Sequence, residues 1–134
     1  ISTANTNEKA IDGRTSGLIN HHEFVTWRAT HFGIIQKLTS KITEFNSPFH
    51  FRDEQEKGPF KYIIHDHNFE VCNDKIKMNE TFKFQSPFGI IGKLFDKFIL
   101  TDYLRKLLTE RNKIIKEYAE TTKWESVLDD MKYK

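Results

Sequence analysis

The stretch that most constrains the fold runs from Phe60 to Phe84, where apolar and polar residues alternate in two segments. Side chains on a β-strand point to its two faces in turn, so a period of two predicts strands. Between the segments, Asn73-Asp74 has the composition of a tight turn. The sequence therefore predicts a β-hairpin that turns at Asn73-Asp74.

One face of this hairpin is apolar but also carries ionisable groups. The opposite face of its second strand consists of lysines with Asn79 and Thr81, which belong in water. The apolar face must then point inward, and it takes His65, His67 and Glu80 with it. Buried polar groups need hydrogen-bond partners or a ligand, so these side chains are the main functional clue. The inward face comprises Ile63, His65, His67, Phe69, Val71, Met78, Glu80, Phe82 and Phe84.

The same period of two precedes the hairpin. It predicts strands at 25–30, 34–45 and 49–56. Glycine, proline and asparagine at 33, 46–48 and 58–59 supply the turns between them, so we expect one antiparallel meander. Near the N-terminus, Gly13 and Gly17 bracket a short strand or turn, and the Asn5 and Glu8 spacing would fit a short helix.

Turn positions fix which residues face each other across neighbouring strands. With turns at 33, 46–47, 58–59 and 73–74, two rows of inward side chains follow, each running from strand to neighbouring strand. The first row is Trp27, Ser40, Asp53, His65 and Phe82; the second is Val25, Ile42, Phe51, His67 and Glu80. The two histidines are therefore expected to lie beside two carboxylates.

After Pro87 the apolar period lengthens to three and four residues, which predicts a helix to about Glu120. Its apolar stripe needs a surface to cover, and the inward face of the sheet is the large apolar surface available. We therefore expect an α+β fold with a curved antiparallel sheet wrapped around a long C-terminal helix. The stripe consists of Ile91, Leu94, Phe95, Phe98, Leu104, Leu107, Leu108, Ile115 and Tyr118.

The chain is one domain long. Residues 1–121 are assigned to that domain and 122–134 to a C-terminal tail. Apolar residues in the tail recur at helical spacing, so the tail is either a short amphipathic helix that docks on the domain or a partner, or a frayed end. They are Trp124, Val127, Leu128 and Met131.

Composition excludes several classes of protein. The net charge is +2 with both signs interspersed, which argues against a nucleic-acid partner. No apolar run reaches the ~20 residues of a membrane span. The single cysteine, Cys72, forms no internal disulfide and fits a cytoplasmic location. Twelve phenylalanines fit either an aromatic core or an apolar cavity.

Six short motifs carry a family resemblance. They are Val25-Thr26-Trp27-Arg28-Ala29, Leu38-Thr39-Ser40-Lys41-Ile42, Phe51-Arg52-Asp53-Glu54-Gln55, Gly58-Pro59-Phe60, His65-Asp66-His67-Asn68-Phe69 and Pro87-Phe88-Gly89. In this order they resemble bacterial ligand-binding proteins of the SRPBCC superfamily, which includes polyketide cyclases, START domains and the birch-pollen allergen. The likeness runs from about Asn5 to Glu120 and implies a helix-grip fold. The family begins with a strand for which this chain has no room, so either that strand precedes the given sequence or one side of the grip is open. Because the chain starts at Ile1, we also expect native residues before it.

The polar groups on the inward face have three interpretations. His-x-His on one strand with Asp53 and Glu80 opposite could bind a metal. The same residues could form a buried network in which each carboxylate holds an imidazole, or the polar floor of a ligand site. We expect the network or the floor, and no metal or other cofactor.

We predict that the domain binds a small, largely hydrophobic molecule or lipid in a cavity between sheet and helix. The expected ligand-binding residues are Trp27, Ser40, Phe51, Asp53, Gln55, His65, His67, Glu80 and Phe82. The alternative is a cyclase- or dehydratase-like enzyme acting on a hydrophobic substrate, with Asp53 and His65 as its acid/base pair. A third hypothesis is an interaction domain whose tail, around Trp124, docks a partner or a second copy.

Overall fold

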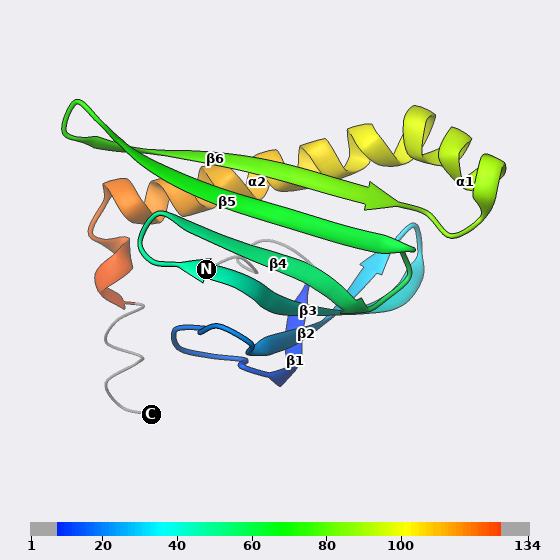
Figure 1. Cartoon of the computed structure of the whole chain (residues 1–134), viewed down its shortest axis with the longest axis horizontal. Helices are drawn as coiled ribbons and strands as arrows, with labels where there is room; N and C mark the ends of the chain where they lie inside the picture. Colours follow the sequence, from blue (N-terminus) through cyan, green and yellow to red (C-terminus); the bar gives the residue numbers. More distant parts are fainter. Residues whose placement is uncertain (1–7, 127–134) are drawn as a thin grey trace.

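The structure is a computed structural model that describes residues 8–126. It has an α+β architecture: a six-stranded antiparallel sheet and a long C-terminal helical segment (Figure 1). The strands lie side by side in their sequence order, because each turn returns the chain beside the strand it has just left. They are β1 (Lys9–Gly13), β2 (Phe24–His31), β3 (Ile34–Asn46), β4 (His50–Lys57), β5 (Tyr62–Cys72) and β6 (Lys75–Gln85).

The helical segment has three consecutive parts. They are α1 (Gly89–Phe95), the π-helical turn η1 (Asp96–Leu100) and α2 (Thr101–Glu120). The Asp96 carboxylate accepts a hydrogen bond from the Ser86 backbone N–H at 2.9 Å, which ties the start of the segment to the end of β6. The predicted helix to about Glu120 is therefore confirmed. Within residues 8–126, no helix is both long enough and apolar enough to cross a bilayer.

Two parts of the sheet contact α2. At the end of β2, His31 Nδ1 lies 2.6 Å from the Tyr103 hydroxyl, and Phe32 in the following turn packs against the Tyr103 ring. On β6, Glu80 accepts a hydrogen bond from Arg111 at 3.1 Å. These contacts place α2 on the inward side of the sheet, while the wrapping of the sheet around the helix stays a prediction.

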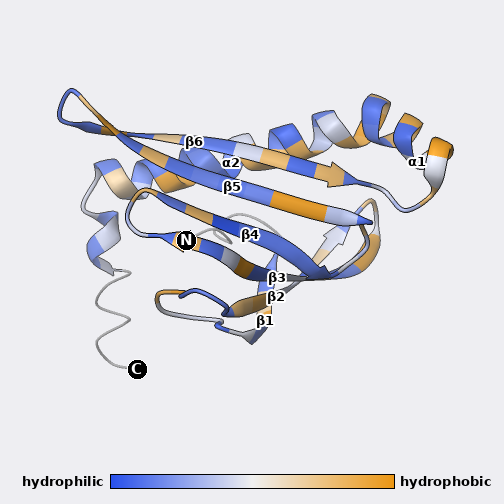
Figure 2. Ribbon diagram, in the orientation of Figure 1, coloured by the Kyte–Doolittle hydropathy of each residue, from blue (hydrophilic) through white to orange (hydrophobic). Residues whose placement is uncertain are grey.

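The helix covers that face only in part. None of the α2 side chains is buried, and the apolar stripe of the first helical turns is exposed, with Ile91 78% and Phe98 67% exposed. Figure 2 shows hydrophobic (orange) stretches in α1, at the end of the helical segment that follows β6. The buried apolar residues among those described are Val25, Ala29, Ile42, Ile63 and Leu100.

The predicted register is confirmed between β4, β5 and β6. Asp53 faces His65, His67 faces Glu80, and the alternate residues of β6 leave its lysines exposed. The inward orientation of both histidines is confirmed as well, since both rings lie beside Glu80, which accepts a hydrogen bond from Arg111 of the helix. His65, His67 and the two carboxylates opposite them therefore have the arrangement that the turns at 58–59 and 73–74 predict.

The predicted register on the other side of the sheet is wrong by two residues. Trp27 faces Leu38 rather than Ser40, because the turn consists of Phe32 and Gly33 alone. Ser40 faces Gln55 rather than Asp53, and Ile42 faces Asp53 rather than Phe51. A three-residue turn at 47–49 and a register shift after Ile42 explain this difference. A shift of two keeps Trp27, Ser40 and Ile42 on their predicted faces, whereas the pairs of β3 and β4 beyond Ile42 differ from the prediction by three residues.

The termini differ from the expectations in one respect. Residues 9–13 form strand β1 beside β2, and the segment between Gly13 and Gly17 belongs to a loop. The expected helix start at Asn5 lies outside the described residues. In the tail, 123–126 form a helical turn, while Val127, Leu128 and Met131 lie outside the described residues.

Candidate functional site

A cavity of about 1130 Å³ lies between the inward face of the sheet and α2. The loop at 14–19, which connects β1 and β2, lines it further, as does Tyr118 on α2. Six of the predicted ligand-binding residues line this cavity: Trp27, Ser40, Phe51, Asp53, His65 and Phe82. The other three, Gln55, His67 and Glu80, do not.

Gln55 has a structural role at the turn between β4 and β5. Its Nε2 donates to the Phe60 carbonyl at 2.7 Å, and its Oε1 accepts from the Phe60 N–H at 3.2 Å. Both polar groups of the amide are thus used within the turn. The nearby Gly58 leaves room for this side chain, because a Cβ there would lie 2.5 Å from Gln55 Oε1 and the amide would have to move.

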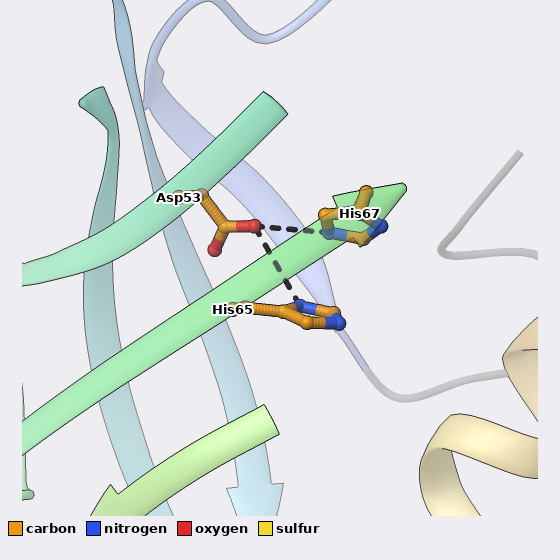
Figure 3. A group of neighbouring side chains, drawn as sticks. All are labelled: Asp53, His65 and His67. Atoms are coloured by element: carbon orange, nitrogen blue, oxygen red, sulfur yellow. Dashed lines mark hydrogen bonds and ion pairs between the residues drawn. The ribbon is translucent and has the colours of Figure 1, made fainter. Parts of the chain in front are cut away.

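The two histidines lie between two carboxylates. Asp53 Oδ2 is 3.2 Å from His67 Nε2 and 3.6 Å from His65 Nδ1 (Figure 3). On the other side, Glu80 Oε1 is 3.2 Å from His67 Nδ1 and 3.4 Å from His65 Nε2. Each of the four imidazole nitrogens therefore faces a carboxylate oxygen.

The strand register produces this arrangement. His65 and His67 are two residues apart on β5, so both rings lie on the inward face, with ring centroids 3.9 Å apart. Asp53 is opposite His65 on β4, and Glu80 is opposite His67 on β6. The flanking strands thus supply one carboxylate on each side of the histidine pair, as cross-strand neighbours do.

The Glu80 carboxylate is held from the helix as well. Arg111 Nη2 donates to its Oε1 at 3.1 Å, and the Asn112 side-chain amide donates to its Oε2. Burial opposes the charged form of Glu80, but the nearby imidazoles, the Asn112 amide and the Arg111 charge outweigh it. Together they hold the pKa of Glu80 far below its usual range.

The same contacts act on His67 in the opposite sense. Burial disfavours its imidazolium form, but hydrogen bonding and charge from Asp53 and Glu80 outweigh that penalty and raise the pKa of His67. The cluster thus combines two carboxylates with a histidine that readily carries a proton.

Three buried polar atoms at this cluster lack a hydrogen-bond partner within residues 8–126. They are His65 Nε2, Arg111 Nε and Asn112 Oδ1. His65 is only 2% exposed, and its contacts with the carboxylates at 3.4 and 3.6 Å are long for hydrogen bonds. Buried polar atoms normally have a partner, so this part of the cavity wall can accept another polar group.

Sequence reasoning missed Arg111 and Asn112, because it took only the apolar stripe of the helix to face the sheet. A signal for Arg111 was present. It follows Leu108 by three residues and precedes Ile115 by four, which places its guanidinium within the apolar stripe. A cation at that position compensates the negative charge of the buried Glu80 carboxylate.

Comparison of the chain with models of protein families, with curated proteins and with solved structures gave no match. Function must therefore be inferred from the residues of this chain and their geometry.

Proposed function

We propose that this chain binds a small, largely apolar molecule, such as a lipid, in the cavity between the sheet and α2. The observation that carries this proposal is the cavity of about 1130 Å³ beside an inward face of half-buried aromatic side chains. Ligand pockets are typically ~300–1,000 Å³, mostly apolar, with a few placed polar groups. Trp27, Phe51 and Phe82 supply the apolar wall, and Asp53 with His65 supplies the polar part.

The ligand that fits this lining has an apolar body and one polar end. Apolar surface gains about 25 cal/mol for each Å² removed from water, so the aromatic wall would supply most of the affinity. A hydroxyl or carbonyl group at the polar end would meet His65 and Asp53. Because a buried polar site rejects a ligand that leaves it unpaired, this end would determine specificity.

The fold supports the family resemblance. A meander of antiparallel strands followed by one long helix agrees with the helix-grip arrangement that the SRPBCC motifs imply. Cavity residues Trp27, Ser40 and Phe51 also fall within three of the quoted motifs. We therefore include membership of this superfamily in the proposal.

A cavity-filling variant tests the proposal. Fluorescence titration with dansyl-labelled undecanoic acid would measure affinity for the wild type, Ser40→Phe and Lys37→Phe. Ser40 lines the cavity, whereas Lys37 is exposed on the same strand. Filling the cavity should weaken binding by roughly tenfold to a hundredfold, and Lys37→Phe should not.

Native mass spectrometry of protein purified without added ligand provides a second measurement, since a retained apolar molecule would appear as an adduct. Equal probe affinity in all three proteins would contradict the proposal, because binding would then lie elsewhere. Absence of both probe binding and adduct in the wild type would also contradict it.

The alternative is catalysis on a hydrophobic substrate by Asp53 and His65. The observation that favours it is that both groups line the cavity with Asp53 Oδ2 only 3.6 Å from His65 Nδ1. Such a pair could move a proton at a carbon next to a carbonyl. The test is deuterium exchange at the α-carbon of 2-undecanone in D₂O. His65→Gln should abolish enzyme-dependent exchange, and no exchange with wild type would remove this alternative.

A further inference from the structure

We propose that Asp53, His65 and His67 form a binding site for a divalent transition-metal ion such as Zn²⁺ at the cavity wall. Glu80 would accept hydrogen bonds from the two ring nitrogens that do not bind the ion. This goes beyond the proposed ligand binding and does not depend on it. The sequence alone favoured a network without metal. The relative positions of the four imidazole nitrogens lead to the different conclusion.

The spacing of the donor atoms fits a metal. One nitrogen from each histidine and one Asp53 oxygen all lie within 4.8 Å of one another. The oxygen-to-nitrogen distances are 3.2 Å to His67 and 3.6 Å to His65. In a tetrahedral zinc site with bonds of about 2.0–2.1 Å, neighbouring ligand atoms are about 3.3–3.4 Å apart. Small side-chain adjustments would therefore complete the site (Figure 3).

The two imidazoles make more contacts with carboxylate oxygens than neutral rings have N–H groups. A neutral imidazole has one N–H and one lone pair, yet His65 and His67 each have a carboxylate oxygen near both nitrogens. Each neutral ring would therefore place its lone pair beside a carboxylate oxygen. A metal ion between Asp53 and the two nitrogens that face it would bind both lone pairs, and both N–H groups would then be directed to Glu80.

The carboxylate behind the rings is a feature of metal sites. Metal-bound histidines almost always donate the other ring N–H to a carboxylate, a carbonyl or water. Glu80 Oε1 is placed to accept from both, at 3.2 Å from His67 Nδ1 and 3.4 Å from His65 Nε2. Arg111 and Asn112 fix that carboxylate in turn. Glu80 would then orient the two ligands rather than bind the ion.

His65 supplies an independent observation. It is only 2% exposed, so its ring is withdrawn from water. The Nδ1 contact with Asp53, at 3.6 Å, is too long for a hydrogen bond. A buried imidazole with such incomplete bonding normally meets a water, an ion or a ligand. Its Nδ1 points toward the centre of the three donor groups (Figure 3).

The donor set identifies the class of metal. Two imidazole nitrogens and one carboxylate suit Zn²⁺, Co²⁺ or Fe²⁺, whereas Ca²⁺ and Mg²⁺ prefer oxygen ligands. Three protein ligands leave a coordination position free, as in catalytic rather than structural zinc sites. Because Asp53 and His65 line the cavity, that position would be open to an oxygen atom of a bound molecule.

Metal titration of the full chain, after treatment with a chelator, tests the site. Isothermal titration with Zn²⁺ should give one tight site, and Co²⁺ should give the visible absorption of a four- or five-coordinate ion. Asp53→Asn and His67→Gln should each weaken Zn²⁺ affinity by more than roughly a hundredfold. Glu80→Gln should weaken it by roughly 10–100-fold, the usual effect of losing an outer carboxylate.

The matched control is the double variant His21→Gln/His22→Gln. These rings stack at the surface with centroids 3.7 Å apart and are the obvious place for adventitious binding. Tight binding that survives Asp53→Asn and His67→Gln, or that disappears in the control, would overturn the proposal. Wild-type NMR keeps the test independent of variant folding: Zn²⁺ must shift the ring nitrogens of His65 and His67, and unchanged resonances would also overturn it.

Discussion

Glu80 Oε1 on β6 lies 3.1 Å from Arg111 Nη2 on α2, and the two side chains are 9% and 23% exposed. This ion pair is a direct link between the strand that carries the inner carboxylate and the helix that closes the cavity. Breaking a buried pair is costly because the remaining charge loses its partner. The position of α2 over the histidines therefore depends on a charge within its apolar stripe.

The first prediction concerns Arg111→Met. It leaves Glu80 buried without its cation and should lower the free energy of unfolding by about 2–3 kcal/mol, below the usual cost of breaking a fully buried pair because Arg111 is partly exposed. Arg105→Met on the same helix is the control, since Arg105 and Asp102 pair in solvent. It should cost about 0.5 kcal/mol or less. Urea unfolding measures the free energy of unfolding of both variants. Equal losses would show that the Glu80–Arg111 pair contributes no more to stability than the exposed Arg105–Asp102 pair.

The second prediction compares two glycines with the same positive φ of +75°. Gly33→Ala should cost about 1–2 kcal/mol for the left-handed backbone alone, because its Cβ would meet open space. At Gly13 the Cβ would also lie 2.2 Å from the Phe24 carbonyl oxygen. Gly13→Ala should therefore detach β1 from β2.

Hydrogen exchange measures this difference directly. The amides of β1 should lose protection in Gly13→Ala and keep it in Gly33→Ala. Retained β1 protection in Gly13→Ala would contradict the steric argument.

The sequence predicted the hairpin geometry because its turns are short and well marked. Asn73-Asp74 joins β5 and β6 with no extra residue, so Cys72 faces Lys75 and each later pair follows by alternation. Between β3 and β4 the same reasoning failed. The shift after Ile42 is a local backbone irregularity that the period of two does not record.

The sequence predicted where the helix ends but not how much of the sheet it covers. A stripe such as Ile91 and Phe98 indicates an apolar face, yet its spacing does not say how far the sheet extends beneath it. Those side chains lie 78% and 67% exposed around α1 and η1. The site was predicted only as far as the strands supply it, because contacts such as Glu80 with Arg111 depend on how the helix lies across the sheet.

The third prediction concerns pH. Glu23 accepts hydrogen bonds from Arg14 Nε and Nη2 at 3.2 and 2.7 Å, and from the Asn20 backbone N–H at 2.7 Å. The Arg14 guanidinium, followed by the Asn20 N–H, lowers the pKa of Glu23. The folded protein therefore binds this proton less readily than the unfolded chain does. Its stabilising contribution is present above the unfolded pKa of about 4.3 and is lost as pH falls through the lower folded value.

NMR titration of the Glu23 side-chain carboxyl carbon measures this pKa. Arg14→Gln should raise it toward the usual value, and the Asn20 amide should titrate with the same midpoint in each protein. Lys9→Gln, which changes a charge on β1 outside this contact, is the control and should leave the midpoint in place. A midpoint that does not respond to Arg14→Gln would contradict the assigned cause.

The fourth prediction concerns the contact between the end of β2 and α2. The Tyr103 hydroxyl lies 2.6 Å from His31 Nδ1 in a partly buried position. Tyr103→Phe keeps the ring against Phe32 but removes this hydrogen bond, so it should lower stability by about 1 kcal/mol. Tyr118→Phe is the control, because the Tyr118 hydroxyl has no hydrogen bond within residues 8–126.

Hydrogen exchange at 31–34 adds a local readout to the denaturation midpoint, because the Tyr103 contact holds the turn after β2 against the helix. Tyr103→Phe should speed exchange there, while Tyr118→Phe should change neither exchange nor the midpoint. His31→Gln combined with Tyr103→Phe should cost little more than the larger single effect, since both changes remove the same bond. Strictly additive losses would show that the two side chains stabilise the fold independently.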